Sequence, residues 1–172
     1  MRRHLILTGL PGAGKSAVGR IVAEKLGAPF HDVDALIEAA EGLSIPAIFD
    51  SRGELAFRRL ERRMVADLLA REPAVLSPGG GWSAQPGVLE ETRGRAVTVY
   101  LETRPETAAE RLRGTATHPL LCDDLVAGVS RLLRERETRY LACDATVSTE
   151  ERGVEQVAGE VLKLARGLAG WG

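Results

Sequence analysis

A glycine-rich stretch near the start of the chain, residues 9–16, has the residue types that bind phosphate. It reads Gly-Leu-Pro-Gly-Ala-Gly-Lys-Ser, between an apolar run at 5–7 and a helical pattern from 17. This strand, loop and helix order is what a phosphate-binding P-loop requires. The loop N–H groups and the helix N-terminus would face the phosphates, with Lys15 adding positive charge and Ser16 free to hold Mg²⁺. The expected ATP-binding residues of this stretch are Gly12, Ala13, Gly14, Lys15, Ser16 and Ala17.

Two carboxylates, Asp32 and Asp34, form a second candidate group. They end a predicted strand over 28–34, and a spacing of two would put both side chains on one face of that strand. One carboxylate can orient an acceptor hydroxyl and take its proton, while the other holds Mg²⁺, in part through water. The residues alone leave open which aspartate does which.

Strands and helices alternate along the rest of the chain. The strands are predicted over 5–7, 28–34, 73–77, 96–101 and 145–148. The helices are predicted over 14–26, 35–40, from 44 onward, 53–70, 88–92, 103–113, 124–141 and from 154 onward. This order predicts an α/β fold: a three-layer sandwich whose five-stranded parallel sheet has helices on both faces.

The predicted topology also says where a ligand would bind. Ligands of such sheets lie beyond the carboxyl ends of the strands. The P-loop, the two aspartates and the triple glycine at 79–81 each follow a strand, so we expect them to meet in one cleft. The small residues over 114–119 predict a mobile lid, at about 113–122. Apolar residues of the last helix form a stripe expected to pack on the sheet, namely Val154, Val157, Val161, Leu164 and Leu168.

Composition narrows the class of protein. With 172 residues, 44% of them hydrophobic and 27% charged, we expect a single domain over 1–172. A net charge of −1 gives no support for a nucleic-acid or membrane-surface partner. The 2 cysteines are too few for a disulfide framework, and no window of about 18 apolar residues is present that could span a membrane. We expect a cytoplasmic protein, and a monomer by default because no long exposed apolar stripe is evident.

The sequence resembles the shikimate kinases, small P-loop kinases related to the nucleoside monophosphate kinases, over nearly the whole chain. The matching segments are 9–16, 30–38, 44–49, 53–54, 57–61 and 79–81. The resemblance implies transfer of a phosphoryl group from ATP to the 3-hydroxyl of shikimate, giving shikimate 3-phosphate and ADP in aromatic amino-acid biosynthesis.

The same resemblance implies roles for individual residues. Asp34 would engage the substrate hydroxyls, and Asp32 would lie near Mg²⁺. Arg58 and Arg136 would bind the substrate carboxylate, for which planar guanidinium groups are suited, and Gly80 would offer its backbone N–H.

Some matches are weaker. Arg136 is followed by Tyr140 as in the family, but Arg134 and Arg139 compete for the same role. Arg111 resembles the arginine that lies along the adenine, although it would equally fit an exposed helix position.

The chain also departs from the family pattern. His118 stands where the family has a lid arginine that reaches the nucleotide phosphates, and a shorter, partly charged histidine would stabilise the transition state less. Arg113 is a possible substitute. Trp82 follows the triple glycine, where a small residue is usual, and would either reshape the acceptor pocket or pack in the core.

Two alternatives stay open at this point. One is another small-molecule kinase of similar architecture, such as a gluconate kinase, which would prefer a different polyol acid. The other is a nucleotide-binding pseudoenzyme or regulatory module, suggested by His118.

Overall fold

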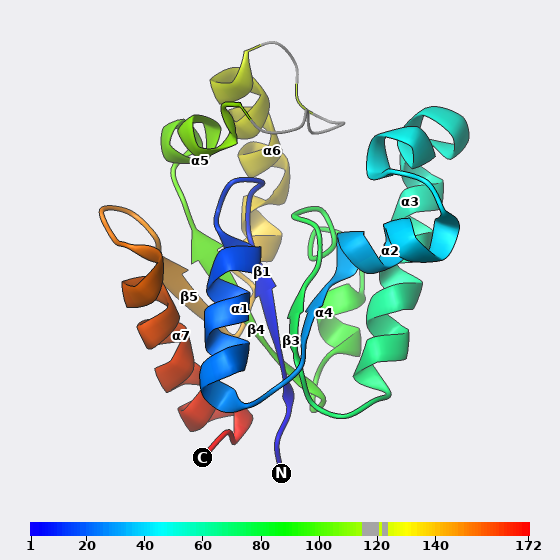
Figure 1. Ribbon diagram of the computed structural model, residues 1–172. Coiled ribbons are helices and arrows are strands. Elements are labelled where there is room, and N and C mark those ends of the chain that lie inside the picture. Colours follow the sequence, from blue (N-terminus) through cyan, green and yellow to red (C-terminus); the bar gives the residue numbers. More distant parts are fainter. Residues whose placement is uncertain (115–120, 122–123) are drawn as a thin grey trace.

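A computed structural model describes residues 1–114, 121 and 124–172. Its strands form one five-stranded sheet in the order β2-β3-β1-β4-β5, and every paired neighbour is parallel (Figure 1). The strands are β1 (His4–Thr8), β2 (Phe30–Asp32), β3 (Val75–Ser77), β4 (Ala96–Glu102) and β5 (Ala145–Ser148). The predicted five-stranded parallel sheet is confirmed.

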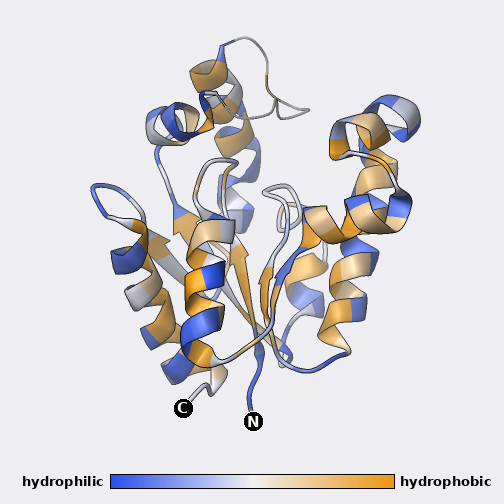
Figure 2. Cartoon of the chain, viewed as in Figure 1, coloured by the Kyte–Doolittle hydropathy of each residue, from blue (hydrophilic) through white to orange (hydrophobic). Residues whose placement is uncertain are grey.

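Helices cover both faces of this sheet. They are α1 (Lys15–Leu26), α2 (Val33–Glu41), α3 (Ile45–Leu69), α4 (Val88–Glu91), α5 (Pro105–Leu112), α6 (Leu125–Tyr140) and α7 (Val154–Ala169). Side chains of β1 alternate between the two faces, because Leu5 and Leu7 pack with α1 and α7 whereas Ile6 packs with α2, α3 and α4. Apolar strands therefore lie between helices with polar outer faces, which gives the predicted three layers (Figure 2).

The end of the second strand differs from the prediction. The chain stops pairing at Asp32, whose carboxylate accepts a hydrogen bond from the Ala35 N–H at 3.3 Å and caps α2. Asp34 therefore lies in the first turn of a helix and not in the strand. The expectation that strand geometry puts both aspartates on one face was wrong, because the capping bond starts the helix two residues early.

Helix α3 joins two segments that were predicted separately. Ser44 caps its start by accepting from the Ala47 N–H at 3.3 Å, and the helix continues to Leu69. Gly53 interrupts it with φ 81° and ψ 168°, a conformation that essentially only glycine adopts. The resulting kink sets the direction of the second half of α3, which carries Arg58 and Glu61.

The apolar stripe of α7 was predicted only in part. Val157 and Val161 are buried, but Val154 and Leu168 are 42% and 43% exposed. Alanines complete the buried face, namely Ala158, Ala165 and Ala169. A sequence rule that follows only the large apolar residues misses the face where small side chains allow close packing.

Trp82 is a core residue of the described structure. Its side chain is 1% exposed and belongs to the apolar cluster between the sheet and α3.

We expect Trp82→Ala to lower the free energy of unfolding by about 3–5 kcal/mol, because removal of a large buried ring leaves a cavity. Urea unfolding measures this loss. Leu55→Ala, at a side chain that is 76% exposed, is the control and should change stability by about 0.5 kcal/mol or less. A loss of less than 1 kcal/mol for the Trp82 variant, on the order of a surface change, would contradict the assignment.

Candidate active site

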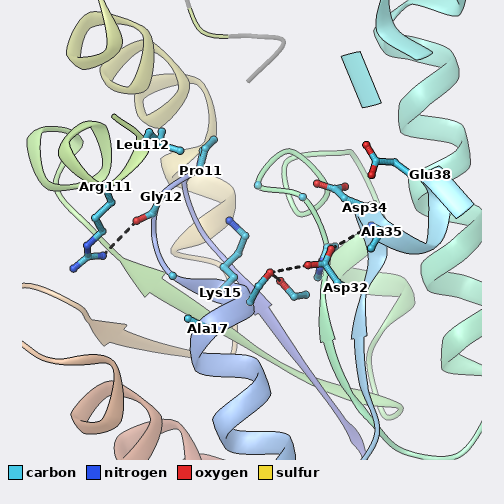
Figure 3. Close-up of a pocket in the computed structure, with 16 residues that line it drawn as sticks. Pro11, Gly12, Lys15, Ala17, Asp32, Asp34, Ala35, Glu38, Arg111 and Leu112 are labelled. Carbon is cyan, nitrogen blue, oxygen red and sulfur yellow. Dashed lines mark hydrogen bonds between the residues drawn. The ribbon is translucent and has the colours of Figure 1, made fainter. Parts of the chain in front are cut away.

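A cavity of about 680 Å³ opens at the carboxyl ends of the strands (Figure 3). Its walls come from the P-loop and the start of α1, from Asp32 and Asp34 at the start of α2, from the last residue of β3 with the three residues after it (77–80), and from the end of α5. The predicted meeting of P-loop, aspartates and triple glycine in one cleft is therefore found. The lid prediction, including His118, falls mainly on residues outside the part of the chain that the structure describes.

Lys15 lies in the middle of this cavity, between the P-loop and the two aspartates (Figure 3). Its ammonium group donates to the backbone carbonyls of Gly9 at 3.0 Å and Leu10 at 2.9 Å. Burial lowers its pKa to about 8, although the nearby Asp34 carboxylate favours the charged form. The positive charge of Lys15 is thus fixed beside the P-loop, inside the cavity.

Oxygen ligands suited to Mg²⁺ lie beside the P-loop. The Ser16 hydroxyl donates to Asp32 Oδ2 at 2.9 Å. The Ser77 hydroxyl oxygen lies 3.4 Å from the Ser16 hydroxyl oxygen. Hydroxyl and carboxylate oxygens are the hard donors that Mg²⁺ prefers, with waters and phosphates completing its shell. The part of the chain that the structure describes contains no cluster of three or more His, Cys, Asp or Glu side chains that could hold a metal alone. The residues fit a Mg²⁺ ion bound together with a nucleotide. Ser77 was not identified from the sequence.

Asp34 has an acceptor oxygen without a partner. Its Oδ1 atom is buried and makes no hydrogen bond among the described residues. Burial, followed by the negative charge of Asp32, raises the pKa of Asp34 to about 6. A carboxylate with a free oxygen and a raised pKa is suited to accept a proton near neutral pH.

Arg58, Arg131 and Arg136 line a second cavity, of about 450 Å³, which Gly81 of the triple glycine also lines. Arg136 is 6% exposed and its Nη1 atom has no partner among the described residues. Arg58 pairs with Glu61 at 2.8 Å and more loosely with Glu54 at 3.4 Å. Of the competing arginines, Arg134 is exposed and Arg139 pairs with Glu90 at 3.3 Å, so Arg136 is the one that faces this cavity. Arg58 and Arg136 can bind a carboxylate between two guanidinium groups.

Close contacts restrict the glycines between the cavities. A Cβ atom on Gly80 would lie 2.5 Å from the backbone carbonyl oxygen of Gly9, and one on Gly81 would lie 2.3 Å from the Arg58 guanidinium, which would have to move. The buried Tyr140 hydroxyl donates to the Gly80 carbonyl at 2.7 Å. The backbone at Gly80 is therefore fixed between the P-loop and α6, as expected for a group that contacts a ligand.

Arg111 bridges two loops. Its guanidinium donates to the Gly12 carbonyl at 3.4 Å, and to the Thr149 hydroxyl at 3.3 Å and carbonyl at 3.4 Å. It also lines a third cavity, of about 270 Å³, together with Ala13, Ala17 and Val154. These contacts hold the exposed Arg111 side chain against the P-loop, beside the third cavity.

Glu61 was quoted in the sequence motifs but given no role. Its side chain is 0% exposed, and burial raises its pKa to about 7. Its Oε2 atom accepts from Arg58 and from Gln85, at 2.8 and 3.0 Å. The signal was present, because steps of four from Phe57 through Glu61 to Val65 put a charged residue on the buried face of the helix.

Comparisons with known proteins agree with one another. The family model for shikimate kinase matches residues 11–166. A shikimate kinase from Persephonella marina is 37% identical, over 95% of this chain and 99% of the relative. One from Nitrobacter winogradskyi is 41% identical, over 94% of this chain and 76% of the relative.

Solved structures give the same result. A shikimate kinase from Acinetobacter baumannii in complex with shikimate is similar with a TM-score of 0.91 and 33% identity, over 98% of this chain and 96% of that one. A gluconokinase from Sinorhizobium meliloti has a TM-score of 0.63 and 22% identity over 98% of this chain and 94% of that one, a likeness of fold alone.

Proposed function

The chain belongs to the shikimate kinase family, and from that premise we propose which of its residues carry out each part of the reaction. It is a kinase that phosphorylates shikimate with ATP in aromatic biosynthesis. The observation that carries the residue assignment is the Asp34 oxygen that has no partner among the described residues, in the cavity that Lys15 and the P-loop line.

The acceptor is bound from two sides. Arg58 and Arg136 hold the shikimate carboxylate, the Gly80 N–H donates to the substrate, and Asp34 accepts a hydrogen bond from the 3-hydroxyl. The oxygen of the 3-hydroxyl attacks the γ-phosphorus of ATP, and Asp34 takes the proton of that hydroxyl. The bond from the γ-phosphorus to the β,γ-bridging oxygen breaks, and that oxygen leaves with ADP.

The donor is held at the P-loop. Backbone N–H groups of residues 12–17 bind the phosphates, Lys15 neutralises charge on the transferred group, and Arg111 lies along the adenine. Ser16 and Asp32 would hold Mg²⁺, which when bound neutralises further charge on the phosphates. The proposal includes a single kinase domain that acts as a monomer in the cytoplasm, which sedimentation and cell fractionation would check.

A coupled assay of ADP release tests the function. Shikimate should stimulate ADP formation, whereas gluconate and buffer should not. Absence of shikimate-dependent ADP would contradict the proposal, and stimulation by gluconate alone would favour the gluconate kinase alternative.

Arg58→Lys tests the acceptor side. The KM for shikimate should rise by about 10- to 100-fold, because lysine cannot bind a carboxylate at two points and one charged hydrogen bond contributes about 1.5–3 kcal/mol. The KM for ATP should stay within about twofold, since Arg58 lines the second cavity and not the one that the P-loop lines. Arg59→Lys, one residue further at an exposed position, is the control. Equal losses for both substrates would show that Arg58 does not bind the acceptor.

A further inference from the structure

Gln85 lies beside the acceptor cavity without any role in the reaction described above. It lines the same cavity as Arg58 and Arg136. Its amide nitrogen lies 3.0 Å from Glu61 Oε2, the atom that also accepts from Arg58 Nη1 at 2.8 Å. A carboxylate has no hydrogen to donate, so the group of Gln85 that faces it is the NH₂ group.

Glu61 needs this second donor. The carboxylate is 0% exposed, and its other oxygen, Oε1, has no partner among the described residues. A buried charge stays ionised only where donors and opposite charges compensate the loss of water. Burial raises the Glu61 pKa to about 7, and Arg58 is the main group that opposes this rise. Arg58 and Gln85 are the two side-chain donors that the structure shows for Glu61, and the Gly79 backbone N–H also favours its ionised form.

Two backbone hydrogen bonds fold the segment that carries Gln85 into a turn. The Gln85 N–H donates to the Trp82 carbonyl at 3.0 Å, and the Trp82 N–H donates to the Gly79 carbonyl at 3.0 Å. The buried Trp82 ring anchors this turn in the core. The turn over 79–85 therefore places the Gln85 amide next to Glu61.

We infer that Gln85 is a positioning residue for the acceptor: its amide fixes the Glu61 carboxylate, which in turn holds the Arg58 guanidinium in the orientation that binds the shikimate carboxylate. The inference rests on the proposed role of Arg58. Gln85 does not line the cavity formed by the P-loop and Asp34, where the phosphates and the reacting hydroxyl are proposed to lie. Its loss should therefore weaken acceptor binding and leave the chemical step unchanged.

Gln85→Met tests the inference, because methionine keeps the length of the side chain and removes the donor. The KM for shikimate should rise by about 5- to 30-fold, part of the effect of one hydrogen bond to a charged group, while kcat and the KM for ATP stay within about twofold. Shikimate binding measured by calorimetry should weaken by the same factor.

Glu91→Gln is the matched control. Glu91 pairs with Arg62, the residue after Glu61, and so also links α3 to the segment after β3, but it lies outside both cavities. This variant should keep the wild-type KM for shikimate. If it raises that KM as much as Gln85→Met does, the effect is a general loosening of α3 and the inference is wrong.

A double-mutant cycle with Glu61→Gln shows whether Gln85 acts through Glu61. In that background Gln85→Met should change the KM for shikimate by less than about twofold. An undiminished effect there, or a wild-type KM in the single variant, overturns the inference. If Glu61→Gln fails to fold, the comparison of Gln85→Met with Glu91→Gln still shows whether Gln85 positions the acceptor.

Shikimate-independent ADP release by the wild-type protein would instead contradict the proposed function itself.

Discussion

Asp34→Asn is expected to lower kcat for shikimate phosphorylation by about 10²- to 10⁴-fold, the usual contribution of a general base. Asparagine keeps the shape and hydrogen-bonding reach of the side chain but cannot take a proton. The KM for shikimate should change little by comparison, because the arginines still bind its carboxylate. Steady-state kinetics with both substrates varied would measure the two effects separately.

The pH dependence identifies the group. Burial, together with the charge of Asp32, raises the pKa of Asp34 to about 6. The wild-type kcat should therefore fall as the pH is lowered through 6, because a protonated carboxyl group cannot accept the hydroxyl proton. The Asn variant should lack this decline in its residual activity. A decline at the same pH in the variant would assign the titration to another residue.

The same substitution should not destabilise the protein. The pKa of Asp34 is raised from 3.8 to about 6, so within this window the folded state binds more protons than the unfolded state. Stability therefore falls as the pH rises through the window, and at neutral pH the ionised carboxylate costs stability that asparagine avoids. Asp34→Asn should melt at or above the wild-type temperature. Asp67→Asn, at an exposed position in α3, is the control and should keep wild-type activity.

The fold was predictable because each part of it has a local signal. Alternating apolar runs and helical patterns indicate parallel βαβ units, and the glycines with Lys15 and Ser16 locate the phosphate site. The boundary at Asp32 was missed because a side chain can end a strand by capping a helix. An aspartate at this position can be either a strand residue or the cap of a helix, and only its bond to the Ala35 N–H distinguishes the two.

The acceptor side was less predictable. Arg58, Gly80 and Arg136 were assigned from family resemblance, and the structure shows why Arg136 differs from its neighbours: it alone of the three candidates is buried. Ser77 and Gln85 have no distinguishing local pattern. Their place beside Ser16 and Glu61 depends on contacts between residues that are 61 and 24 positions apart, which periodicity does not encode.

Lys15→Met is expected to lower kcat by about 10²- to 10³-fold, the usual effect of removing one preorganised group that stabilises transition-state charge. The Lys15 ammonium is held at the P-loop by the carbonyls of Gly9 and Leu10, so its charge lies beside the loop that binds the phosphates. Burial lowers the pKa of Lys15 to about 8, so kcat/KM for ATP should decline above pH 8 as the ammonium group loses its charge. This decline should be absent in the Lys15→Met variant. Lys25→Met is the matched control, since it makes the same substitution in the same helix at a side chain that is 49% exposed and pairs with Glu155. If both variants lose activity equally, or if Lys15→Met stays within about tenfold of wild type, Lys15 does not stabilise the transferred phosphoryl group.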